Sequence, residues 1–204
     1  MKYSLATYLL TITIISFLGF CVENVWLAFT QKCIDNRNMS LPFLLGYGLA
    51  VVGIYFIFGT PKKWLSKKLS NKFGVYFSYF ILMMLLVSIG EIILGKTVEH
   101  ICGFSYWNYE WIPLHFTKYT SVPTSIGFAG IIVFFMDYIM EPVLYNVQML
   151  PYTVLNSLAA VFSILLVCDF IASFRKMYRK QGQNKRWRYE FSCKYRKQYP
   201  MISK

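Results

Sequence analysis

Charged side chains are scarce in this chain. Asp, Glu, Lys and Arg together make up 15% of its 204 residues, and only 9 of these residues are acidic. A typical soluble domain carries about 25% charged residues, so the composition does not fit an ordinary water-soluble protein. The charge that is present has mainly one sign, because 21 Lys and Arg residues give a formal net charge of +12.

Histidine is scarce and the cysteines show no metal-binding spacing, which argues against metal, disulfide and Cys/His catalytic sites. The two histidines are His100 and His115, and the five cysteines contain no C-x-x-C pair. We therefore predict no metal site, no cofactor and no disulfide framework. His100 and Cys102 are two residues apart, a spacing that points their side chains to opposite sides of a helix. This argues against a Cys/His catalytic pair and favours a protein that is not an enzyme.

Long uncharged apolar runs, in contrast, fill most of the chain. They cover residues 3–22, 38–61, 73–90, 119–136 and 142–168. A helix needs about 20 mostly apolar residues to cross a membrane. We therefore predict an all-α, polytopic membrane helix bundle of about five transmembrane helices at 1–174, followed by a basic, aromatic cytoplasmic tail at 175–204. Pro142 is expected to end the fourth span near Met140.

Basic residues give the expected orientation. With five spans, the tail shares a side with the loops that carry Lys32, Arg37 and Lys118, whereas Lys2 and the loop at 62–72 lie opposite. Because Lys and Arg concentrate on the cytoplasmic side, the count favours a cytoplasmic tail and an outside N-terminus, although the 62–72 loop runs against the rule. The tail suits an anionic lipid surface, so we expect membrane lipids rather than nucleic acid as its partner.

Residues 90–97, GEIILGKT, match the phosphate-binding pattern G-x-x-x-x-G-K-[ST]. That pattern works where a strand delivers a loop onto a helix N-terminus, so that backbone N–H groups surround the phosphate. Here the preceding residues belong to an apolar span. We therefore predict that the match is inert and that the chain does not hydrolyse ATP by itself.

Carboxylates within or at the ends of apolar spans are the stronger functional signal. They are Glu23, Glu91, Asp137, Glu141 and Asp169, and Lys96 is the only nearby cation expected at comparable depth. Ionisable residues in lipid are costly and usually mark a pathway or a binding site. The alternative, a protonated or capped carboxyl near the interface, stays open, with equal weight for the three acids near helix ends.

We predict that Glu23, Glu91, Glu99 and Asp169 belong to a substrate-binding site. Glu91 and Glu99 are eight residues apart, which places them about 12 Å apart along a continuous helix. We expect Glu23 and Glu91 to face the bundle interior and to approach one another or a shared polar group. Two carboxylates in one low-dielectric cavity repel, so a shared proton, a bound cation or a cationic substrate group is expected there.

The segment at 103–111 is rich in glycine and aromatic residues and is followed by Pro113. We predict an irregular or re-entrant stretch at the membrane interface, where Tyr and Trp side chains prefer to lie. An ordinary loop with an aromatic anchor is the open alternative. Tyr106, Trp107, Asn108 and Tyr109 would close the substrate cavity from this side.

Several of these residues resemble the pattern of a family of bacterial membrane proteins, the putative ABC-transporter type IV family. The elements that carry the resemblance are Gly19–Glu23 for Gly-Trp-x-x-Glu, Asn36-Arg37, the 41–48 stretch, Glu91 with Glu99, Tyr106–Tyr109 for Trp-Trp-Asp-Tyr, Ile126-Gly127, Pro142 and Asp169 with Ser173. The resemblance covers residues 10–174. It implies a transport function, a separate ATPase subunit and a multi-pass location in the bacterial cytoplasmic membrane.

The first functional interpretation is therefore a transporter-like permease or permease subunit, with a polar cavity lined by intramembrane carboxylates. One alternative is a membrane-embedded enzyme that acts on a lipid or lipid-linked substrate, with Glu91 and Glu99 as acid and base. Another is a non-catalytic membrane accessory protein that docks through its tail. Assembly as a homo-oligomer is left open.

Overall fold

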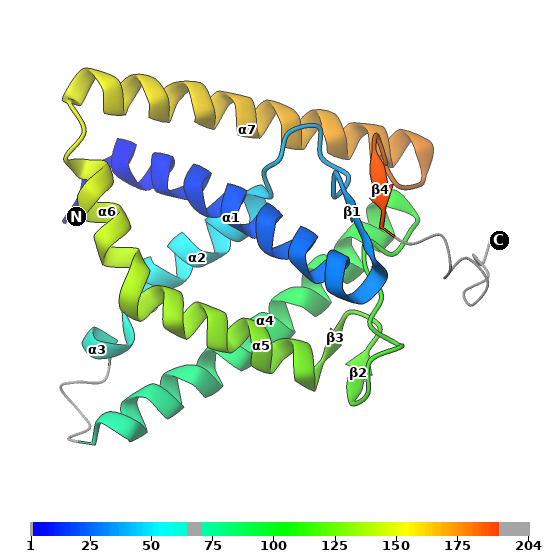
Figure 1. The fold of residues 1–204 in the computed structure, drawn as a ribbon, viewed down its shortest axis with the longest axis horizontal. Helices are drawn as coiled ribbons and strands as arrows, with labels where there is room; N and C mark the ends of the chain where they lie inside the picture. Colours follow the sequence, from blue (N-terminus) through cyan, green and yellow to red (C-terminus); the bar gives the residue numbers. More distant parts are fainter. Residues whose placement is uncertain (1, 65–70, 192–204) are drawn as a thin grey trace.

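The computed structural model describes residues 2–64 and 71–191, and most of them are helical (Figure 1). The helices are α1 (Leu5–Gln31), α2 (Leu45–Phe58), α3 (Pro61–Trp64), α4 (Lys72–Cys102), α5 (Val122–Phe134), the π-helix η1 (Phe135–Ile139), α6 (Met140–Gln148) and α7 (Tyr152–Lys180). Within the described residues they form five segments that are long and apolar enough to cross a membrane. The predicted all-α membrane bundle is confirmed.

Local hydrogen bonds fix where these helices begin and end. The Ser4 hydroxyl accepts from the N–H of Thr7 at the start of α1, and Ser121 and Thr124 form a reciprocal capping box at the start of α5. Such caps satisfy N–H groups that have no partner inside the helix. α4 ends at Gly103, whose left-handed φ of 70° suits a residue without a side chain.

The fourth span does not end at Pro142, contrary to the prediction from sequence. Its helix continues through η1 into α6 and ends at Gln148. Proline lacks an N–H, and its ring clashes with the carbonyl four residues earlier, here that of Tyr138. Tyr138 lies in η1, where the wider π-turn changes the hydrogen-bond pattern. The widened turn thus accommodates a proline that would interrupt a regular α-helix.

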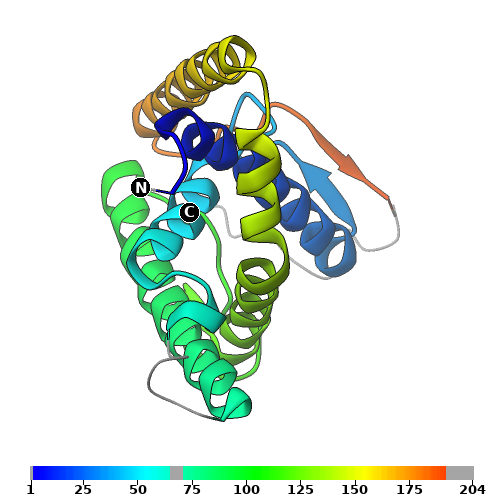
Figure 2. The same ribbon diagram turned by 90° about the vertical axis from the view of Figure 1, so that its left-hand side faces the viewer.

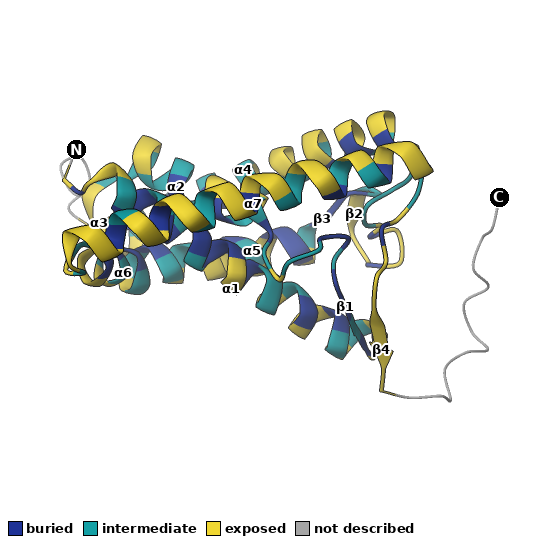
Figure 3. Cartoon of the chain, turned by 90° about the horizontal axis from the view of Figure 1, so that it is seen from above, coloured by how far each residue is buried: buried dark blue, intermediate teal, exposed yellow. Residues whose placement is uncertain are grey.

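α1 lies inside the bundle, packed against α2, α6 and α7, while α4 packs against α5 (Figure 2). The largest buried cluster includes Tyr8 and Ile15 of α1, Tyr79 and Met83 of α4, and Met136 of η1. The outer face of α7 is exposed along its length (Figure 3). Its exposed side chains are apolar, among them Val161, Ile164 and Ile171, as expected for a surface that contacts lipid.

Two short antiparallel sheets lie at the end of the bundle where α1 and α4 end (Figure 1). They were not predicted from the sequence. β1 (Cys33–Asp35) pairs with β4 (Arg188–Glu190), and β2 (His115–Thr117) pairs with β3 (Thr120–Ser121). The first sheet joins the loop after α1 to the segment after α7. Segments from early and late in the sequence therefore meet at one end of the bundle.

Candidate functional site

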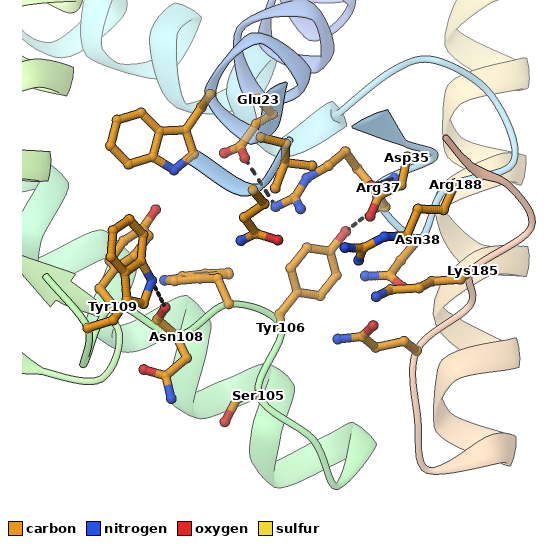
Figure 4. A pocket seen from close by; sticks show the side chains of 16 residues that line it. Glu23, Asp35, Arg37, Asn38, Ser105, Tyr106, Asn108, Tyr109, Lys185 and Arg188 are labelled. Carbon is orange, nitrogen blue, oxygen red and sulfur yellow. Dashed lines mark hydrogen bonds and ion pairs between the residues drawn. The ribbon is translucent and has the colours of Figure 1, made fainter. Parts of the chain in front are cut away.

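A cavity of about 290 Å³ lies at this end of the bundle (Figure 4). It is enclosed by the last turns of α1, the 35–38 turn, the 105–111 segment and the segment at 183–188. Its charged side chains are Glu23, Asp35, Arg37, Lys185 and Arg188. Its aromatic side chains are Trp26, Tyr106, Trp107, Tyr109 and Trp111. A cavity of this size with aromatic walls and a few charged groups is suited to a small polar solute.

An enclosed ion pair lies at the inner side of the cavity. Arg37 Nη2 lies 3.1 Å from Glu23 Oε2, and each side chain is 14% exposed. The Tyr47 hydroxyl, from α2, donates to Glu23 Oε1. The sequence placed Arg37 only in a connecting turn, so its pairing with Glu23 was missed. The expected cation at Glu23 is therefore supplied by the protein itself.

The turn that carries Arg37 is held by several hydrogen bonds. Arg37 and Asn38 have φ values of 46° and 62°, and the Arg37 N–H donates to Asp35 Oδ1 at 2.8 Å. The Tyr106 hydroxyl donates to the Arg37 carbonyl at 2.5 Å. Asp and Asn often stabilise turns of this kind through bonds to the nearby backbone. The guanidinium is thus positioned by a rigid turn rather than by a helix.

The segment at 103–111 is irregular, as predicted, and residues from 105–111 line the cavity. The Tyr109 N–H donates to the Lys118 carbonyl at 2.8 Å, and Trp107 Nε1 donates to the Tyr119 carbonyl at 2.8 Å. The structure therefore brings Tyr106, Trp107, Asn108 and Tyr109 together with Glu23 around one cavity. The position of this segment at a membrane interface stays a prediction.

Burial raises the pKa of Tyr106 to about 12 and that of Tyr109 well above its usual range. After burial, the next causes at Tyr109 are the carboxylates of Glu23 and Glu91. Tyr109 is therefore within electrostatic reach of both glutamates. It also remains a neutral hydroxyl group at physiological pH, able to donate a hydrogen bond.

Glu91 does not line the cavity. Its Oε2 atom is buried and has no hydrogen-bond partner in the described part of the chain. Nearby, α4 packs against α5 and β3, where three hydroxyls connect: Ser88 Oγ lies 2.8 Å from Ser125 Oγ, which lies 3.1 Å from Thr120 Oγ1. A buried carboxylate oxygen without a hydrogen-bond partner is costly, so Glu91 is incompletely satisfied in this position.

Glu99 and Asp169 also lie outside the cavity lining. Glu99 Oε1 lies 2.6 Å from Lys118 Nζ and accepts from Ser105 Oγ at 3.1 Å. This contact with Glu99 is the main cause that raises the pKa of Lys118. Asp169 accepts from the backbone N–H groups of Ser40 and Leu41, both at 3.0 Å. These bonds anchor the loop after β1 on α7.

The acids at the opposite end of the bundle are paired as well. Asp137 Oδ1 lies 3.1 Å from Lys62 Nζ, and Glu141 Oε2 lies 2.7 Å from Lys2 Nζ. The expectation that Lys96 is the only cation near the membrane acids is therefore wrong. The counter-charges come from Lys62 of α3 and from Lys2, whose long side chains reach the carboxylates.

Three buried asparagines, Asn36, Asn38 and Asn184, attach the segment after α7 to the turn. We call them the asparagine clasp. Asn36 Nδ2 donates to the Asn184 carbonyl at 2.9 Å, the Asn184 N–H donates to Asn38 Oδ1 at 2.9 Å, and Asn184 Nδ2 donates to the Asn38 carbonyl at 3.1 Å. Sequence reasoning missed the clasp because no periodic pattern links positions so far apart.

In residues 2–64 and 71–191, no three His, Cys, Asp or Glu side chains come together as metal ligands. A family model described as putative ABC-transporter type IV matches residues 10–174. Searches of curated proteins and of solved structures found no match. The cavity wall at 183–188 lies beyond the matched residues.

Proposed function

The chain belongs to the putative ABC-transporter type IV family, and from this premise we propose that it is the membrane-spanning subunit of a transporter whose cavity holds the transported solute. Its five apolar helical segments make it a multi-pass membrane protein. The observation that supports the proposal is that Glu23 and Tyr106–Tyr109 line one cavity. Small-molecule sites commonly combine aromatic walls with a few polar groups in this way.

Energy for transport would come from a separate ATPase subunit. Residues 90–97 lie inside α4, where backbone N–H groups are engaged in helical hydrogen bonds and cannot surround a phosphate. The described residues therefore give the pattern no structural context for nucleotide binding. A partner ATPase is the usual counterpart implied by the family description.

We place the protein in the bacterial cytoplasmic membrane with its tail in the cytoplasm, because basic residues favour that side. The cavity, at the same end of the bundle as the tail, would then open toward the cytoplasm. Solute would enter it from inside the cell.

Co-expression with candidate ATPase subunits from the same cell tests the proposal. We expect the two proteins to copurify and ATP hydrolysis to depend on the presence of the membrane subunit. Lys96→Gln, which alters the inert pattern, should leave this hydrolysis unchanged. A protein that purifies without an ATPase and converts lipids by itself would contradict the proposal and support a lipid-acting enzyme with Glu91 and Glu99.

A further inference from the structure

The charges of the cavity are not balanced. Three cations, Arg37, Lys185 and Arg188, face two carboxylates, Glu23 and Asp35. Glu23 is already paired with Arg37, and Asp35 is 5% exposed and accepts the Arg37 N–H. Outside the cavity lining, Glu190 Oε1 lies 3.1 Å from Arg188 Nε. The cavity itself therefore keeps an excess of positive charge, and Lys185 is the cation of the 183–188 segment that forms no ion pair among the described residues.

Two donor groups at the cavity lack an acceptor. Arg37 Nε is buried without a hydrogen-bond partner in the described part of the chain. None of the ion pairs among the described residues includes Lys185. Partial desolvation of the ammonium, followed by the charge of Arg188, lowers the pKa of Lys185, so the two cations repel one another. An anion between the Lys185 ammonium and the Arg188 guanidinium would relieve this repulsion and accept hydrogen bonds from both groups.

The backbone holds both cations in place. Lys185 directly follows Asn184 of the asparagine clasp, and the Arg186 N–H donates to Asn36 Oδ1 at 3.1 Å. Arg188 lies opposite Asp35 in the β1–β4 pair. Figure 4 shows Lys185 and Arg188 beside Asp35 and Asn38, with Tyr106 between this group and the aromatic wall. Because these positions are fixed before a ligand arrives, little ordering cost is expected on binding.

We propose that the cavity binds its solute through a phosphate-type anionic group, and that Lys185 and Arg188 determine this specificity. The inference rests on the proposed function, in which the cavity holds the transported solute. Arginine suits phosphate because its planar fork donates two parallel hydrogen bonds, and lysine adds a compact charge. The aromatic side chains would contact the apolar part of the same solute. Both specificity residues lie outside the 10–174 range matched by the family model.

Tryptophan fluorescence of the purified full-length protein tests this inference, because Trp26, Trp107 and Trp111 line the cavity. The protein is titrated with glycerol 3-phosphate, with neutral glycerol and with choline as a cation. We expect a saturable response to glycerol 3-phosphate alone. The same measurement in nanodiscs of phosphatidylglycerol or phosphatidylcholine shows whether the phosphate belongs to a free solute or to a lipid headgroup.

Lys185→Gln combined with Arg188→Gln should weaken the binding of glycerol 3-phosphate at least about tenfold, since each lost charged hydrogen bond contributes substantially to affinity. Arg186→Gln is the matched control, because it removes a charge from the same segment but not from the cavity lining. Its affinity should equal that of the wild type. Lys185→Gln alone repeats the test with little risk to folding, because the Lys185 side chain is largely exposed and only its ammonium group is partly desolvated.

A phosphatidylglycerol-specific response, lost in the double variant, would support the inference with a lipid headgroup as the phosphate source. Three results would overturn it: a response to choline or glycerol rather than to the anions, no response in a folded protein, or equal weakening by Arg186→Gln. Copurification with an ATPase is measured separately. The anion preference can therefore fail while the transporter proposal stands.

Discussion

Glu23 and Arg37 show at the residue scale how the protein retains charges among apolar helices. Glu23→Gln would leave the enclosed Arg37 guanidinium without a counter-charge. Breaking an ion pair of this kind costs about 3–5 kcal/mol, because the remaining charge stays buried. We expect a corresponding loss of stability in denaturant unfolding in micelles. The double variant Glu23→Gln/Arg37→Gln should lose less than the sum of the single variants, whereas additive losses would contradict a direct pair.

For a glutamine substitution at Glu91 we expect no loss of stability, in contrast to Glu23. Its Oε2 has no partner in the described part of the chain, so Glu91→Gln keeps the shape of the side chain and removes an uncompensated charge. Expression and thermal stability should equal or exceed those of the wild type, while transport falls. Glu99→Gln is the control, because it breaks the Lys118 contact outside the cavity. Wild-type transport by Glu91→Gln would remove Glu91 from the proposed pathway.

The pKa of Lys185 gives a prediction for pH. Burial and the neighbouring Arg188 lower this pKa from the ordinary value of 10.5. The ammonium therefore loses its proton at a lower pH than a free lysine, and the cavity loses a positive charge. Affinity for glycerol 3-phosphate should fall as the pH rises, starting below 10.5. Lys185→Arg should bind without this fall, since arginine remains charged in that range.

At the scale of elements, Gly48 brings α2 close to α1. A Cβ at Gly48 would collide with the Ile12 carbonyl and the Ser16 hydroxyl, whereas a Cβ at Gly53 would meet nothing within 4 Å. Gly48→Ala should destabilise the protein by about 1–3 kcal/mol through overpacking. Gly53→Ala should be neutral or stabilise by up to about 1 kcal/mol. Equal unfolding midpoints for the two variants would contradict this difference.

The helices were predictable from the sequence because each apolar run carries its own signal, independent of the rest of the chain. The wall at Tyr106–Tyr109 was predictable for the same reason, since glycine and aromatic residues mark it locally. The Glu23–Arg37 pair and the β1–β4 sheet were not, because they depend on how a turn and a distant segment meet in space. The end of the fourth span was predicted wrongly, because residue types do not reveal the widened turn of η1 that accommodates Pro142.

For the whole molecule, the main open prediction is orientation. Five spans place the loops after α1 and α4 and the segment after α7 at one end, as Figure 1 shows. Cys193, which lies outside the described residues, reports on the tail. A membrane-impermeant thiol reagent should label it in inverted vesicles but not in intact cells. The matched control is Lys62→Cys at the opposite end, which should be labelled in intact cells. Labelling of Cys193 from outside would reverse the orientation.

The asparagine clasp also has a consequence for biosynthesis. Asn36 and Asn184 are 148 residues apart, so at roughly 5–20 residues per second Asn184 is synthesised about 7 to 30 seconds after Asn36. The ribosome has then completed all five apolar segments. Insertion into the membrane thus comes before closure of the cavity, and a premature stop codon after Lys180 would leave an inserted bundle whose cavity never gains its last wall.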